Sequence, residues 1–186
     1  MKARQQYLYL LLLGLLARPA LASGDPVTWT ARLEPADARS GEGARIVVTA
    51  KMAALWHIYA LTQPGNGPVP TRIELVPGKA LVAAGKPVQP RPDRKQDPGF
   101  NMDVEEYEGS VVFGVPVKLT SEAAGVQNAT VRVRYQACSS ANCRLPKTLE
   151  VPVSFTVAPG PARLDHALLL TTVPGQPAGG ADAGRR

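Results

Sequence analysis

Two cysteines, Cys138 and Cys143, are the only ones in the 186-residue chain, and both lie in the stretch YQACSSANCRLPKT. Thiols separated by four residues can form a disulfide that either holds the fold or exchanges with a partner's disulfide. Closing so short a loop removes little chain entropy, so the bond contributes only about 2 kcal/mol as a staple. The spacing therefore fits a weak staple or a redox pair, and it leaves both roles open.

Two arginines, Arg134 and Arg144, lie close to the cysteines in the sequence. Positive charge near a thiol favours the reactive thiolate, so we expect these arginines to activate the pair. The spacing is not that of a thioredoxin C-x-x-C motif, and no βαβ pattern surrounds it. Strict alternation from Val133 places Cys138 on the arginine face of its strand, unless a bulge reverses the parity.

The elements that must position the cysteines are two alternating segments, residues 129–137 and 148–157. Val131, Val133 and Tyr135 alternate with arginines in the first segment, and the second alternates in the same way. Because the segments are close in sequence, they predict a hairpin with one cysteine on each arm near its turn. Facing β-carbons on such a hairpin lie about 4.5–5.5 Å apart, which permits a disulfide after slight distortion.

The rest of the chain also predicts short strands. Eighteen prolines and 17 glycines make long helices improbable, and seven or eight strands recur about every 8–12 residues. This pattern predicts an all-β fold, an immunoglobulin-like antiparallel β-sandwich, over residues 23–158. The expected strands are residues 27–35, 44–52, 56–61, 71–76, 109–119, 129–137 and 148–157, with a weaker one at 79–89. Residues 91–107 are expected to be a polar loop.

Both ends of the chain differ in composition from this domain. Residues 1–22 have a basic start, an apolar run and an A-x-A pattern, which predict a signal peptide cleaved after Ala22. An uncleaved anchor is the alternative, although the apolar run is short for a membrane span. We therefore expect a periplasmic protein without stable membrane insertion, in a compartment where a disulfide persists. Residues 159–186 are rich in Pro, Gly and Ala and predict a disordered tail.

Three segments together resemble the N-terminal periplasmic domain of DsbD, the thiol:disulfide interchange protein. The first holds Tyr135, Gln136 and Ala137 before Cys138, then Cys143 and Pro146. The others are WHIYALTQPGNGPVPTRIEL and DPGFNMDVEEYEGSVVF, and the likeness extends over about residues 26–157. One departure is Lys147, which stands where the family often has a second proline.

The resemblance implies a thiol:disulfide oxidoreductase component that shuttles electrons through Cys138 and Cys143 without a dissociable cofactor. It implies that Cys143 attacks the partner, that Cys138 resolves the mixed disulfide, and that Phe100 caps the pair. The expected partners are periplasmic thioredoxin-like proteins. A separate membrane electron-transfer protein is expected to supply the reductant, because this chain lacks the membrane domain of full-length DsbD.

Further residues are candidates for lining the site. The resemblance places Trp56 and Tyr59 there, although such aromatics are more often core residues. Tyr135, Gln136 and Arg144 complete the candidate set. The acidic run from Asp103 to Glu108 is expected to be a solvated loop face.

Two other functions remain open. One is a binding or assembly module whose disulfide is inert. The other is a copper-handling protein of cytochrome assembly, since His57, Met52, Met102 and the cysteines are ligand types that suit copper(I). Their spacing supports no metal site. A modest positive charge on an exported protein also gives little support for nucleic-acid binding.

Overall fold

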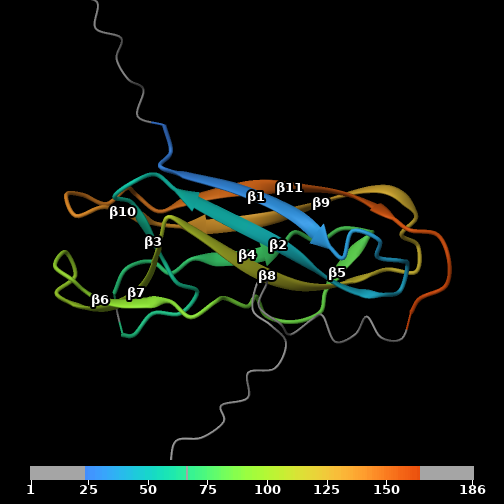
Figure 1. Ribbon diagram of the computed structural model, residues 1–186, viewed down its shortest axis with the longest axis horizontal. Coiled ribbons are helices and arrows are strands. Elements are labelled where there is room, and N and C mark those ends of the chain that lie inside the picture. The colour runs from blue at the N-terminus through green and yellow to red at the C-terminus, as the bar shows by residue number, and fades with distance from the viewer. Residues whose placement is uncertain (1–23, 66, 164–186) are drawn as a thin grey trace, which may run out of the picture.

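The computed structural model describes residues 24–65 and 67–163. Within these residues the fold is an immunoglobulin-like β-sandwich made of eleven strands and three antiparallel sheets, with no helix (Figure 1). This confirms the predicted fold class. The predicted signal peptide and residues 164–186 of the predicted tail lie outside the described part of the chain.

Two of the sheets form the sandwich. The first has the order β1-β2-β8-β5 and the second the order β11-β9-β4. The bounds of these strands are β1 Val27–Glu34, β2 Gly43–Met52, β4 Arg72–Leu75, β5 Leu81–Ala83, β8 Ser110–Leu119, β9 Gly125–Tyr135 and β11 Lys147–Val157. The predicted hairpin is confirmed, because β9 pairs with β11 from Tyr135↔Lys147 to Gly125↔Val157.

The core between these sheets follows from the alternation of apolar residues along the strands. Ile46 and Val48 on β2, Phe113 on β8, and Val131 and Val133 on β9 are all fully buried. Burying one such side chain stabilises the fold by about 1.5–3 kcal/mol. The sandwich is therefore a stable support for the smaller sheet at its end.

The third sheet has the order β10-β3-β7-β6 and lies at one end of the sandwich, on the left in Figure 1. Its strands are β3 His57–Tyr59, β6 Asp93–Asp97, β7 Met102–Glu108 and β10 Ala137–Cys138. The expectation of a polar loop at 91–107 was therefore wrong, since β6 and β7 form a hairpin there. The many charged residues hid the alternation of buried and exposed side chains along β7, in which Val104 and Glu106 are buried.

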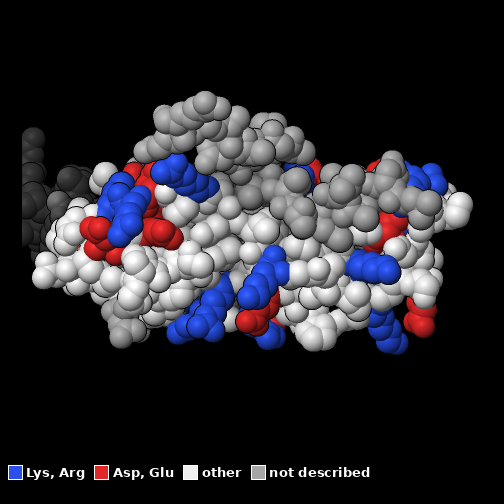
Figure 2. Space-filling model, turned by 90° about the horizontal axis from the view of Figure 1, so that it is seen from below, with Lys and Arg blue, Asp and Glu red and all other residues white. Residues whose placement is uncertain are grey.

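Ion pairs satisfy the charges of this hairpin. Arg94 contacts Asp103, and Lys95 contacts Glu106 and Glu108. Figure 2 shows acidic and basic side chains intermingled at this end of the molecule. In the described residues no helix has the length and apolar character needed to cross a membrane.

The first residues of the predicted tail are held at the opposite end of the sandwich. Ala158 bridges to Arg39, and the Arg163 guanidinium contacts Asp37 and the buried carboxylate of Glu42 at 2.8 Å each. The hydrogen bond from Arg163 holds the pKa of Glu42 down at about 2, against an ordinary value of 4.5. The chain is thus anchored up to at least Arg163.

Replacing Arg163 with alanine should lower the midpoint of thermal unfolding by several degrees near neutral pH, because the buried carboxylate of Glu42 loses its ion pair with Arg163. A carboxyl whose folded pKa is depressed contributes stability above its unfolded pKa, and this contribution is lost as the pH falls. The difference between wild type and Arg163→Ala should thus be full above about pH 4.5 and shrink toward about pH 2. Arg32→Ala, which removes an exposed ion pair to Glu34, is the matched control and should change little. Equal midpoints for all three proteins would contradict the anchor.

Candidate redox site

The disulfide joins Cys138 to Cys143 in the connection at the turn end of the β9–β11 hairpin, with the two Cα atoms 4.0 Å apart. Residues 139–142 form the tight connection, in which the amide of Ser139 donates to the carbonyl of Asn142 at 2.9 Å. The amide of Arg144 donates to the carbonyl of Ala137 at 2.8 Å. Backbone hydrogen bonds on both sides of the bond therefore fix the two cysteines opposite one another.

The two sulfurs differ in access to solvent. Cys138 is 1% exposed and packs with Tyr59 and Val104, whereas Cys143 is exposed. The predicted parity for Cys138 was wrong, because the chain leaves β9 after Tyr135 and enters the third sheet as β10. Its side chain then faces an apolar cluster rather than the arginine face.

Alternation brings the functional side chains of the third sheet to one face. Cys138 pairs with His57, and His57 pairs in turn with Glu108 on β7. Tyr59, two residues after His57, pairs with Glu106. Because paired residues and residues two apart share a face of a sheet, all five side chains lie on the same side as the disulfide.

Four of these residues, Cys138, His57, Glu106 and Glu108, line a groove of about 510 Å³. Its walls are the cysteine loop on one side and the β6–β7 hairpin with Leu55 on the other. The groove is where a partner's sulfur can approach Cys143. Its lining includes His57, Lys95, Asp97, Glu106 and Glu108.

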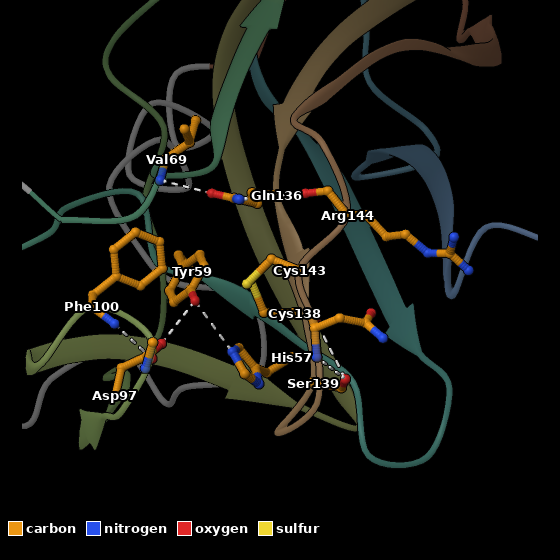
Figure 3. The surroundings of a disulfide bond; sticks show 12 residues. His57, Tyr59, Val69, Asp97, Phe100, Gln136, Cys138, Ser139, Cys143 and Arg144 are labelled. Atoms are coloured by element: carbon orange, nitrogen blue, oxygen red, sulfur yellow. Dashed lines mark hydrogen bonds between the residues drawn. A yellow bond between two sulfur atoms is a disulfide. The ribbon is translucent and has the colours of Figure 1, made fainter.

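Tyr59 is fully buried beside Cys138, and its hydroxyl donates to Asp97 at 2.9 Å (Figure 3). Burial, together with the hydrogen bond to Asp97, raises the pKa of Tyr59 far above its ordinary value, so the phenol stays protonated. Tyr59 was predicted to line the site; the structure places it in a small buried cluster with Cys138 and Val104, and it is not part of the groove lining.

Phe100 lies in the turn of the β6–β7 hairpin, directly after Pro98 and Gly99. The carboxylate of Asp97 accepts the amides of Gly99 and Phe100 at 2.8 and 3.3 Å, which shapes this turn. The Phe100 ring is 37% exposed and stands edge-on to Tyr59, with centroids 6.1 Å apart. In the view of Figure 3 Tyr59 lies between Phe100 and the disulfide. Phe100 therefore packs against Tyr59, and its role as a cap of the disulfide stays a prediction.

A cluster of charges forms the floor of the groove. Lys95 binds Glu108 at 2.6 Å and Glu106 at 3.0 Å. These hydrogen bonds, to Glu108 first and Glu106 second, raise the pKa of Lys95, and the bond from Lys95 lowers the pKa of Glu108. The acidic run was expected to be a solvated face, but Glu106 is only 4% exposed, and Lys95 makes its burial tolerable.

The expectation that Arg144 activates the cysteines was wrong, because its guanidinium does not lie beside the sulfurs (Figure 3). Its guanidinium lies 5.5 Å from the ring centre of Trp56, and Figure 3 shows it extending away from the disulfide. Trp56 itself is half-buried against the main core. Arg134 lies on an exposed part of β9, where it pairs with Thr148 and Arg72.

Tyr135 and Gln136, which precede Cys138 in the sequence, have structural roles. Tyr135 is buried in the main core, and its hydroxyl donates to Asp25 at 2.6 Å. The side chain of Gln136 accepts the amide of Val69 at 3.2 Å and donates to the carbonyl of Arg144 at 3.4 Å. Gln136 thus ties the hairpin end to the loop before β4, and neither residue is part of the groove lining.

The candidate copper ligands are not all brought together. Met52 belongs to the main core, whereas Met102 packs with the small cluster that contains Cys138. Among the described residues no group of three or more His, Cys, Asp or Glu side chains is arranged to hold a metal ion.

The sequence matches the family described as thiol:disulfide interchange protein DsbD, N-terminal, over residues 30–154. That stretch is more than half of the chain. This protein belongs to the DsbD N-terminal family. The family supports a thiol:disulfide interchange module, and a Cys138–Cys143 disulfide is present in the structure. No curated protein matches the sequence.

Three solved structures of DsbD-type domains are similar to this DsbD N-terminal family member. The reduced DsbD N-terminal domain of Neisseria meningitidis is 19% identical, with a TM-score of 0.41, and the match covers 64% of this chain and 82% of that one. The N-terminal periplasmic domain of ScsB from Proteus mirabilis is 20% identical, with a TM-score of 0.44, over 70% of this chain and 45% of that one. The third structure is the complex of the DsbD and PilB N-terminal domains from N. meningitidis. It is 19% identical, with a TM-score of 0.40, and the match covers 74% of this chain and 86% of that one.

Proposed function

We propose that this protein is a periplasmic module that carries electrons through the Cys138–Cys143 pair to partner proteins. The observation that carries the proposal is the asymmetry of the pair, with Cys143 exposed above a groove and Cys138 buried beside Tyr59. In such a pair the exposed sulfur can react with a partner, and the buried sulfur can then resolve the mixed disulfide. An inert staple needs neither the groove nor the asymmetry.

The exchange follows from this arrangement. In the reduced protein the thiolate of Cys143 attacks the partner's disulfide, and a mixed disulfide forms while one partner sulfur leaves. Cys138 then attacks Cys143, which releases the partner as a dithiol. Two electrons and two protons pass to the partner, and Cys138 and Cys143 end as a disulfide. The protein itself holds the electrons, so the reaction needs no dissociable cofactor.

The expected partners are thioredoxin-like proteins, with a separate membrane electron-transfer protein as the source of electrons. The solved complex between the DsbD and PilB N-terminal domains of N. meningitidis supports a protein partner of this kind. The ScsB relative is described as a periplasmic domain, and the predicted signal peptide at residues 1–22 agrees with that location.

The proposal is tested by mixing the reduced protein with the oxidised PilB N-terminal domain and alkylating the free thiols at successive times. Electron transfer predicts that the thiols of this protein disappear as those of the PilB domain appear. If both proteins keep their starting thiol counts although the PilB disulfide is the more easily reduced, the shuttle is wrong and the inert module is favoured.

Leu55 is an exposed apolar residue whose position fits contact with the partner. It lines the groove, is 87% exposed and has a φ of 69°, a conformation that leucine adopts only at a cost. Asparagine tolerates this conformation, so Leu55→Asn should raise the free energy of unfolding by up to about 1 kcal/mol. The same change should slow exchange with the PilB domain roughly threefold to tenfold through lost apolar contact.

Stopped-flow rates with the PilB domain and with a small disulfide reagent check this prediction. Val126→Asn removes another exposed apolar side chain, at the far end of β9, and should leave both rates unchanged. Equal slowing of the small reagent by Leu55→Asn would show a change in the cysteines themselves and would argue against a docking role.

A further inference from the structure

The histidine beside the disulfide has no role in the exchange as described so far. The register pairs His57 on β3 with Cys138 on β10, so the two side chains share a face of the sheet. Both also line the groove, and Figure 3 shows the His57 ring beside Cys138. His57 is therefore placed next to the sulfur that must resolve the mixed disulfide.

The surroundings of His57 fix its ring. Its Nε2 atom lies 3.5 Å from the carboxylate of Glu106 and 3.5 Å from the hydroxyl of Tyr59. The ring stands edge-on to Tyr59, with centroids 5.3 Å apart, and its side chain is 14% exposed. Glu106 is in turn held by Lys95 at 3.0 Å. The ring has one orientation and one buried carboxylate next to it.

Cys138 needs a group that can take its proton. Its sulfur is buried against Tyr59 and Val104, and burial in apolar surroundings disfavours a thiolate. Yet only the thiolate attacks a disulfide. Neither arginine supplies the compensating charge, since Arg144 stacks on Trp56 and Arg134 lies on exposed β9.

The other titratable groups around His57 are unsuited to this task. Tyr59 stays protonated and donates to Asp97, and Lys95 stays charged between Glu106 and Glu108. The two glutamates are already engaged by Lys95. An imidazole, in contrast, gains and releases a proton in the physiological pH range.

We propose that His57 accepts the proton of Cys138 in the resolving step and that Glu106 is the positioning residue that orients its ring. The inference rests on the proposed electron shuttle. The proton moves from the Cys138 sulfur to the imidazole, and the Cys138 thiolate attacks the Cys143 sulfur. The bond between Cys143 and the partner's sulfur breaks, and the leaving partner thiolate takes up a proton. The cysteine pair is oxidised and the partner's disulfide is reduced.

A small disulfide, 4,4′-dithiodipyridine, separates the two steps in the full-length mature protein. Attack by Cys143 releases the first thiopyridone, and resolution by Cys138 releases the second. His57→Gln should slow the second release roughly tenfold or more near about pH 7 and change the first less than about twofold. The deficit should narrow as the pH rises, because the thiol then ionises without a base.

Two glutamate variants separate orientation from charge. Glu106→Gln should also slow the second release, whereas Glu105→Gln, which removes a charge from the opposite face of the same strand, should leave it within about twofold of wild type. These variants also test the proposal if His57→Gln does not fold.

Three outcomes would overturn the role of His57: an unchanged second release, equal slowing of both releases, or a deficit that persists at high pH. Equal effects of the two glutamate variants would overturn the positioning role of Glu106. Electron transfer to the PilB domain is measured separately from these two releases, so failure of the His57 proposal is distinct from failure of the shuttle.

Discussion

Cys143→Ser should lower the rate of exchange with a partner disulfide by roughly a thousandfold or more, as the loss of a nucleophile does. Cys138→Ser should instead react once and hold the partner in a stable mixed disulfide. The reason is the difference in access, since Cys143 is exposed and Cys138 is 1% exposed. Non-reducing electrophoresis and intact mass after mixing with the oxidised PilB domain will measure both results.

The two serine variants are matched controls for each other. Both lose the same disulfide, so both should lose about the same stability, on the order of 2 kcal/mol. Different trapping at equal stability can then arise only from the separate positions of the sulfurs. Trapping by Cys143→Ser and loss of exchange in Cys138→Ser would reverse the assignment. Loss of folding in both variants would favour a structural disulfide.

Phe100→Ala should speed the reaction of the reduced protein with a small thiol reagent by about tenfold, because exchange depends on access to sulfur. The Phe100 ring packs edge-on against Tyr59, which in turn packs with Cys138. Removing the ring uncovers Tyr59 and loosens the Asp97 turn at the edge of the groove. Since the ring is 37% exposed, the free energy of unfolding should fall by only about 1 kcal/mol.

Phe155→Leu is the control for destabilisation alone. Phe155 is a buried aromatic at the far end of the β9–β11 hairpin, where it pairs with Gln127. This variant should lose more stability than Phe100→Ala and keep the wild-type thiol reactivity. If Phe155→Leu accelerates the reagent as much as Phe100→Ala does, general loosening explains the effect and Phe100 is no cap.

The sandwich and its hairpin could be predicted because their alternation is carried by apolar residues. In residues 129–137 apolar residues, among them Val131, Val133 and Tyr135, occupy every second position, and this predicted both the pairing with β11 and the place of the cysteines near the turn. The same rule failed for β6 and β7, where charged residues fill both faces. Only the burial of Glu106, made possible by Lys95 on the neighbouring strand, reveals that segment as part of the sheet.

The candidate site was predicted in part. The resemblance led to Cys138, Cys143, Phe100 and Tyr59, and the structure gathers them at one end of the molecule. The side-chain contact of His57 with Glu106 was missed, because it depends on the register of strands separated by more than 40 residues. An alternation count through DVEEYE, with Val104, Glu106 and Glu108 on one face, was the available signal.

Arg144 was predicted to belong to the site on its sequence position, and the structure does not place its guanidinium beside the cysteines. Proximity in sequence suggested that Arg144 acts on the cysteines, but the stacking of its guanidinium on Trp56 turns it outward. Local spacing does not give the direction of a long side chain, which depends on packing against a distant strand or loop. The charges that line the groove come from β3, β6 and β7 instead.

The reduction potential of the Cys138–Cys143 disulfide tests the central claim most directly. The mature protein is equilibrated with glutathione redox buffers, and the oxidised fraction is measured by mass after alkylation. A shuttle predicts a potential above about −300 mV, so that reductants of the compartment and partner disulfides exchange with it. A value below about −300 mV would mark a structural bond and contradict the account.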